Sequence, residues 1–148
     1  MDNSEIRLDG VFLLTLNKAN GESITICKHN LITTIGFDFI CDCIGNPSNR
    51  PNVMGYIGLG AGSAAPAESQ TTLTSEIRRL PATYSHTAGT KVFTMSAIFN
   101  AGVGTGAIAE AGIFNDSTGG VMLDRVSFAV INKGVDDTLT AQFTFTLS

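Results

Sequence analysis

The chain has 148 residues, of which 43% are hydrophobic and 15% charged, and its net charge is -4 with a pI of about 4.9. This length fits one domain with a core of its own, and the composition excludes a disordered chain and a coiled coil. No apolar run approaches the roughly 20 residues of a membrane-spanning helix. The acidic balance offers no counter-charge to a phosphate backbone. We expect a single domain over residues 1–148 that binds neither membrane nor nucleic acid.

The N-terminus and the cysteines indicate where the chain resides. Residues 1–5 are polar and acidic, where a secretory signal would have basic and then apolar residues. We expect a short, mobile N-terminal arm on a protein that stays in the compartment where it is made. Cys27, Cys41 and Cys43 are an odd number and too few for a disulfide framework, so we expect reduced thiols.

The first elements are a hairpin and a helix. Residues 11–16 and 22–27 flank a short polar stretch that ends in an Asn-Gly pair, which predicts two strands and a tight turn. Apolar residues then recur every three or four positions from Leu31 to Ile44, with Thr33 or Thr34 available as the N-cap. This predicts one amphipathic helix over about residues 31–44, followed by a proline-bounded loop.

Beyond that loop the apolar residues recur at every second position. Residues 73–80 fit a strand or a short helix equally well. Strands are predicted elsewhere, over residues 53–59, 82–87, 91–99, 107–114, 121–131 and 139–147. Many short strands with regular turns predict a mostly β fold, an antiparallel β-sandwich or jelly-roll-like domain with one inserted α-helix.

The sequence carries no strong signature of a chemical site. The glycine runs at 58–62 and 102–106 lack the spacing and the lysine of nucleotide-binding loops, so we interpret them as flexible connectors. Cys27, His29, Cys41 and Cys43 could in number hold Zn²⁺, but their spacing argues against it. We therefore interpret Cys27 and Cys43 as small core residues and His29 as a loop residue.

Other polar residues have ordinary structural explanations. His86 falls near a hairpin tip, where we expect it to be solvated. Asp116, Asp124 and the Asp136-Asp137 pair fall at predicted turns and strand ends, without a calcium-loop signature. We expect no catalytic site, no metal and no cofactor.

Glu110 stands out because it lies within a run otherwise suited to burial, Ala107 to Phe114. A buried carboxylate needs a charged or hydrogen-bonding partner. Arg78 and Arg79 are the candidates, and we expect an internal ion pair that fixes the strand register.

Several segments of the chain match a familiar pattern. They are Tyr56 to Arg79, with T-x-L-x-x-E-x-x-R at its end, Ile108 to Asn115, with I-x-E-x-G-I-F, and Asn132 to Leu147, together with His29 to Ile40 upstream. In these segments the chain resembles small virion structural proteins of tailed bacteriophages, over roughly residues 30–148. A related pattern, with Leu where this chain has Ile113, occurs in the N-terminal parts of tail-collar fibre proteins.

The resemblance implies two alternative roles. The first is that of a capsid decoration, or cement, protein, a jelly-roll-like domain that binds as a dimer or trimer across major capsid subunits and stabilises the shell. The second is that of a tail, collar or fibre-anchoring component. Because the sequence ends directly after its last predicted strand, with no shaft or tip, we favour the first.

We therefore expect a non-enzymatic virion protein on the capsid exterior, made in the cytoplasm of the bacterial host. Its expected partners are the major capsid protein, or tail and collar proteins in the alternative, and further copies of itself. A carbohydrate-binding β-sandwich is a remote alternative, because sugar sites favour exposed aromatic platforms and the chain has no Trp and only Tyr56 and Tyr84.

Overall fold

The strands form two antiparallel sheets of five strands each in a computed structural model that describes residues 5–148. Sheet A has the order β2-β1-β10-β7-β6 and sheet B the order β3-β9-β8-β4-β5. The strands are β1 (Leu8–Asn17), β2 (Ser23–His29), β3 (Leu31–Ile32), β4 (Tyr56–Gly60), β5 (Glu76–Pro81), β6 (Thr83–His86), β7 (Val92–Phe99), β8 (Gly106–Phe114), β9 (Met122–Lys133) and β10 (Thr138–Leu147). The expected β-sandwich with one helix is confirmed. Residues 1–4 of the expected mobile arm lie outside the described residues.

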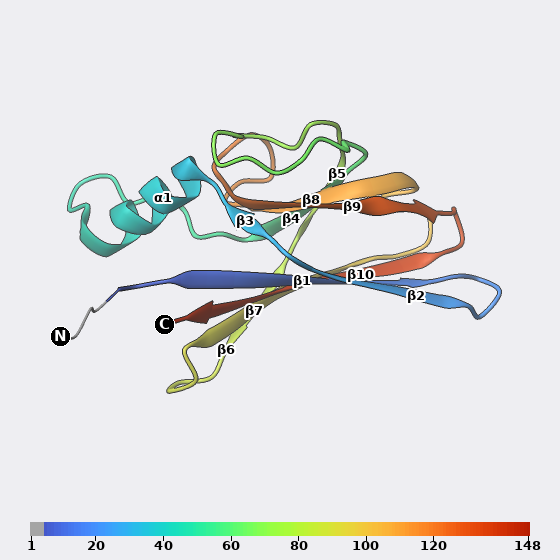
Figure 1. Cartoon of the computed structure of the whole chain (residues 1–148), viewed down its shortest axis with the longest axis horizontal. Helices are drawn as coiled ribbons and strands as arrows, with labels where there is room; N and C mark the ends of the chain where they lie inside the picture. Colours follow the sequence, from blue (N-terminus) through green and yellow to red (C-terminus); the bar gives the residue numbers. More distant parts are fainter. Residues whose placement is uncertain (1–4) are drawn as a thin grey trace.

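Figure 1 shows the two sheets as stacked layers, with helix α1 (Thr34–Gly45) at one end. Three hairpins, β1–β2, β6–β7 and β8–β9, each stay within one sheet. The predicted Asn-Gly turn joins β1 to β2, and Gly21 has the positive φ of 92° that such a turn needs. The segment 73–80, which fitted both strand and helix, overlaps strand β5.

The core lies between the two sheets. Alternate side chains of β10 and β7 point inward, as the period-two recurrence of apolar residues in these segments predicts. Aromatic rings fill the centre of the core, where the Phe12 and Phe143 centroids are 4.7 Å apart and those of Phe12 and Phe128 5.5 Å apart. Phe12 lies on sheet A and Phe128 on sheet B, so this stack joins the layers.

Helix α1 begins later than the sequence predicts. Leu31 and Ile32 form β3, which pairs with β9, so the helix starts after them. Of the two predicted N-cap candidates, Thr33 is the N-cap, and its Oγ1 accepts a hydrogen bond from the Gly36 N–H at 2.9 Å. Ile44, expected on the buried face, is 77% exposed because the last turn runs past the end of sheet B (Figure 1). Within the described chain, no helix combines the length and the apolar character needed to cross a membrane.

Strand β8 is buried on both faces. Its inward side chains meet the core, whereas its outward side lies under the long loop 61–75 between β4 and β5. This loop, green in Figure 1, passes over the outer face of sheet B. Glu110 lies on that covered face, and the loop and the strand together form the site described next.

Candidate functional site

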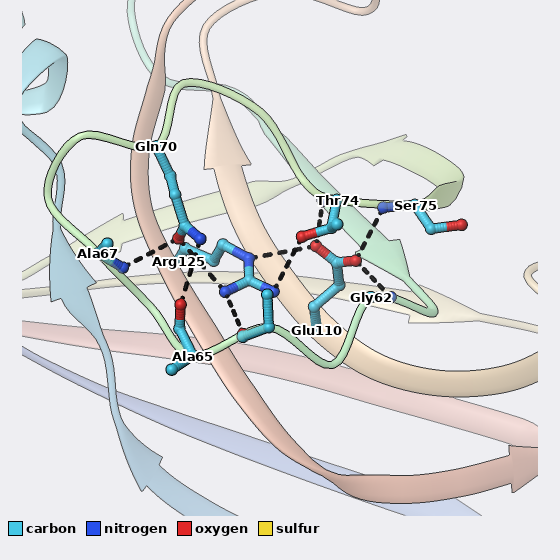
Figure 2. A network of polar contacts seen from close by, with 9 residues as sticks. Gly62, Ala65, Ala67, Gln70, Thr74, Ser75, Glu110 and Arg125 are labelled. Atoms are coloured by element: carbon cyan, nitrogen blue, oxygen red, sulfur yellow. Dashed lines mark hydrogen bonds and ion pairs between the residues drawn. The ribbon is translucent and has the colours of Figure 1, made fainter.

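The outer face of β8 holds a fully buried ion pair. Arg125 Nε lies 3.2 Å from Glu110 Oε1, and the two side chains are 1% and 0% exposed. Figure 2 shows this pair surrounded by the 61–75 loop. The buried carboxylate expected in this segment is present.

The carboxylate of Glu110 is held by three backbone N–H groups of the loop. Oε1 accepts from Thr74 N at 2.7 Å, and Oε2 accepts from Gly62 N at 2.5 Å and Ser75 N at 3.0 Å. Hydrogen bonds to an ionised acceptor are stronger than neutral ones. A single side chain therefore holds both ends of the loop to sheet B.

The guanidinium of Arg125 binds the middle of the same loop. Its Nη1 donates to the Ala64 carbonyl at 2.7 Å and to Gln70 Oε1 at 3.3 Å, and Nη2 donates to Thr74 Oγ1 at 3.3 Å. Gln70 in turn donates to the Ala65 carbonyl at 3.2 Å. We call Glu110, Arg125 and the loop groups they bind the buried clamp (Figure 2).

The register of the β8–β9 hairpin explains why these two residues meet. Arg125 lies directly opposite Gly112, and Gly112 and Glu110 share one face of β8. Glu110 and Arg125 are thus diagonal neighbours across the strand pair, within reach for long side chains. Small residues leave the space, since a Cβ on Gly60 would lie 2.6 Å from the Ser75 carbonyl oxygen.

The predicted partners of Glu110 are wrong. Arg78 and Arg79 are on the edge strand β5, which is separated from β8 by β4. Strand β9, which pairs with β8 directly, supplies Arg125. Arg79 instead pairs with Glu76 at 2.7 Å and lies 3.5 Å above the Phe114 ring. Arg78 forms no ion pair among residues 5–148.

Arg79 makes a second link to the same part of sheet B. Its Nη1 donates to the carbonyls of Asp116 and Gly119, both at 2.9 Å. Arg79 therefore holds the β8–β9 turn against β5. Glu76, Arg79, Glu110, Gly112 and Phe114, which belong to the patterns that carry the phage resemblance, all lie in or beside these two ion pairs.

Asp124 is a second buried carboxylate, which the sequence placed at a turn or strand end. It lies within β9 and is fully buried. Its Oδ1 accepts from Ile113 N at 3.0 Å, and its Oδ2 accepts from Asn30 Nδ2. Burial raises the pKa of the Asp124 carboxyl to about 7, against the opposing effect of these hydrogen bonds. The expectation for Asp124 is therefore wrong, and the alternation along β9 was the signal for its burial.

Asp137 behaves as the sequence predicts. Its carboxylate accepts from Gly134 N at 2.7 Å within the β9–β10 turn and from Ala19 N at 3.0 Å in the β1–β2 turn. These two backbone N–H groups lower the pKa of Asp137. Asp137 thus joins two turns at one end of the sandwich.

The cysteines and histidines do not gather. Cys27 and Cys41 are exposed and Cys43 is half-buried, so the expectation that Cys27 and Cys43 are core residues is wrong for Cys27. Cys27 lies on the outward side of β2, and His29 ends that strand rather than lying in a loop. His86 is exposed near the β6–β7 turn, as expected. Across residues 5–148, no three His, Cys, Asp or Glu side chains cluster in a way that could hold a metal ion.

The two glycine runs have different roles. Gly102 and Gly104 have positive φ in the β7–β8 connection, and Gly106, also with positive φ, begins β8, so this run is largely a connector as expected. Gly58 and Gly60 instead lie within β4, and Gly62 donates to Glu110. The expectation of a flexible connector is wrong for the first run, because the buried clamp holds it.

The tyrosines do not form a shared platform. Tyr84 lies on β6 of sheet A, and Tyr56 lies on β4 of sheet B. Tyr56 lines a wide, open hollow of about 650 Å³ with Pro51, Asn52, Pro81 and Asn115 among its neighbours.

Both charges of the buried clamp are matched by hydrogen bonds from within the chain, so the clamp organises a loop rather than presenting a reactive group. Comparison of the chain with protein-family models, with curated proteins and with solved structures gives no match.

Proposed function

We propose that this protein is a non-enzymatic structural component of a tailed-phage virion, a decoration protein that binds across major capsid subunits on the outside of the shell. The observation that carries the proposal is the outer face of sheet A. Together with the sequence resemblance, it favours a protein that acts by broad surface contact.

The outer face of sheet A is almost free of charge. The side chains between the buried ones of β1, β10 and β7 point away from the core. They are mostly short and uncharged, and those already half-buried in the free chain are Val11, Thr15, Val92, Thr94, Ser96, Thr138, Thr140, Gln142 and Thr144. On the outward positions of these three strands, Asp9 is the one ionised side chain.

Such a face suits a lasting contact with another protein. Interface centres are depleted in charged residues, because each buried charge must be desolvated. Short threonine and serine side chains lose little rotamer entropy when they are covered. Repeated contacts with a symmetric shell then add through multivalency.

An add-back experiment tests the proposal. Labelled protein is mixed with phage particles assembled without it, and the bound fraction is measured after sedimentation. Wild-type protein is expected to saturate the shells. Gln142→Glu, which adds one charge at the centre of sheet A without changing size, should weaken binding at least tenfold, about 1.4 kcal/mol.

Asn49→Asp provides a matched control, because it adds the same charge to an exposed loop after α1. The control should bind like wild type. Saturation of tails but not of shells would favour the tail or collar alternative, and equal binding by Gln142→Glu would remove the outer face of sheet A from the interface.

A further inference from the structure

Strand β2 is a sheet edge open along its whole length. Among residues 5–148 it pairs with β1 alone, and it runs for seven residues without a break in register. Exposed edges tend to pair with another chain unless charge, proline, a bulge or shortness prevents it. Neither proline, a bulge nor shortness protects β2. Its one charged side chain, Lys28, lies on the inward side and donates to the Ser127 carbonyl at 2.9 Å, so it disfavours a partner strand that brings no carboxylate to face it.

The other edges carry such protection. Strand β3 has two residues and β6 has four. Strand β5 carries two arginines and ends at Pro81. The part of β9 beyond β3 is bulged, since its register against β8 shifts between Ile131 and Ser127. Strand β2 is therefore the edge suited to receive a partner.

The backbone groups of β2 that point outward can be assigned. Asn30 N donates to Gly10 O at 3.2 Å, and Lys18 N donates to Glu22 O at 2.8 Å, at the two ends of the β1–β2 ladder. Because hydrogen-bonded pairs alternate along antiparallel strands, the even-numbered residues of β2 bond to β1. The N–H and C=O groups of Thr25 and Cys27 thus point away from the sheet.

The sequence of β2 is complementary to itself in one antiparallel register. With Thr25 facing Thr25 of a second copy, Ile24 faces Ile26 and Glu22 faces Lys28. If the register is shifted by two residues, Lys28 faces Ile24 instead. Of these two registers, only the one centred on Thr25 pairs opposite charges with each other and apolar side chains with each other. It also uses the outward N–H and C=O groups of Thr25 and Cys27.

An apolar hollow beside β2 would be covered by the same contact. It has about 310 Å³ and is lined by Ile24 and Ile26 of β2 and by Val130 of β9, which is 56% exposed. In the register centred on Thr25, the isoleucines of the second copy extend this apolar row.

We propose that the protein forms a two-fold symmetric dimer in which β2 strands of two copies pair antiparallel about Thr25, joining the two copies of sheet A into one continuous sheet. A two-fold axis makes both halves of the contact identical, which a self-complementary strand requires. This inference does not depend on what the outer face of sheet A binds.

Disulfide cross-linking tests the register. Paired residues with Cα atoms about 5.5 Å apart can form a disulfide, so Ser23→Cys should cross-link to Cys27 of the second copy on mild oxidation. The background carries Cys41→Ser, which removes the other exposed thiol. The unmodified Cys27 pair is about 13 Å apart in this register and should stay reduced. Ser85→Cys on the β6 edge is the matched control and should give no dimer.

A backbone variant tests the edge itself. Thr25→Pro removes an outward N–H and no bond to β1, so the fold should persist while the dimer dissociation constant rises at least about tenfold. Light scattering after size exclusion should give a dimer mass for wild type and a monomer mass for Thr25→Pro. A monomeric or trimeric wild type, or Ser23→Cys that does not cross-link, would overturn the proposal. If Thr25→Pro fails to fold by circular dichroism, the cross-linking result decides.

Discussion

Glu110 and Arg125 show how a mostly neutral β domain can hold a long loop. The two charges neutralise each other in a site that water does not reach, and each also binds loop backbone. A buried pair of this kind contributes little net stability compared with apolar residues, but removing one partner leaves the other uncompensated. Its value here is that it specifies one loop conformation.

Glu110→Gln should therefore be strongly destabilising. The amide leaves Arg125 buried without a counter-charge, and we expect a loss of about 3 kcal/mol and a fall in melting temperature of about 10 °C, measured by differential scanning calorimetry. Glu68→Gln, an exposed carboxylate in the same loop, should change neither value. An unchanged melting temperature for Glu110→Gln would contradict the role assigned to the buried clamp.

Asp124 makes the stability depend on pH in a defined direction. Its pKa is raised to about 7 in the folded protein from an ordinary value of 3.8, so the folded state binds the proton more tightly. This contribution to stability is complete below about pH 4 and is lost as the pH rises to about 7. The span corresponds to roughly 4 kcal/mol.

Asp124→Asn isolates this effect. The variant keeps an oxygen that can accept from Ile113 N and removes the titration. As the pH rises from 4 to 7, we expect the unfolding free energy of Asp124→Asn to increase relative to that of the wild type. Above pH 7 the difference between the two proteins should stay constant. Urea titrations at several pH values measure it. A difference that is constant across this range would show that Asp124 is not buried as a carboxyl with a raised pKa.

At the scale of elements, the 61–75 loop acts as a third layer over sheet B. Small residues beneath it allow the backbone to approach, and Leu73 packs with Phe114 and Met122 in a small second core. The loop therefore behaves as part of the domain and not as a free connector.

Gly62→Ala should loosen this layer. Its Cβ would collide with Glu110 Oε2 and with Thr74, so the three N–H bonds to Glu110 could not all form. We expect a loss of about 2 kcal/mol and faster amide hydrogen exchange at Thr74 and Ser75. Gly45→Ala, where nothing lies within 4 Å of the new Cβ, is the control and should be close to neutral. Equal amide exchange rates at Thr74 and Ser75 in the two variants would contradict the role assigned to the buried clamp.

Local signals predicted most strands and the hairpins that join neighbouring ones, but not the pairing of strands that are distant in the sequence. Period-two alternation and turn residues predicted the hairpins and the inward faces of β7 and β10. The pairing of β1 with β10, from opposite ends of the chain, leaves no local mark in the sequence. The start of α1 was misplaced because Leu31 and Ile32 fit both a helix face and a short strand that only β9 selects.

The site was predicted in part for the same reason. The burial of Glu110 followed from its apolar neighbours, whereas its partner depended on which strand lies beside β8. The β8–β9 turn was visible in the sequence, and counting back along that hairpin would have placed Arg125 diagonally across from Glu110. Arg78 and Arg79, the candidates for a charged partner, lie on β5, and Arg79 serves a different ion pair.

At the scale of the whole molecule, the sandwich has two unlike outer faces. Sheet B is covered by the 61–75 loop, whereas sheet A presents open rows of short uncharged side chains. The proposed pairing through β2 would join two such faces into one surface. The segments that carry the phage resemblance contribute to both faces: residues 56–79 and 108–115 form or lie under the loop, and residues 132–147 include β10 at the centre of sheet A.

The position of the protein in the virion tests the decoration proposal most directly. If the chain is a virion protein as proposed, a cryo-EM reconstruction of its virion would show where density matching the sandwich lies. We expect this density on the outside of the icosahedral shell, across the joints between capsid subunits. The outer face of sheet A should be turned toward the capsid subunits. Density confined to the neck, collar or tail, or a particle without the protein, would contradict it.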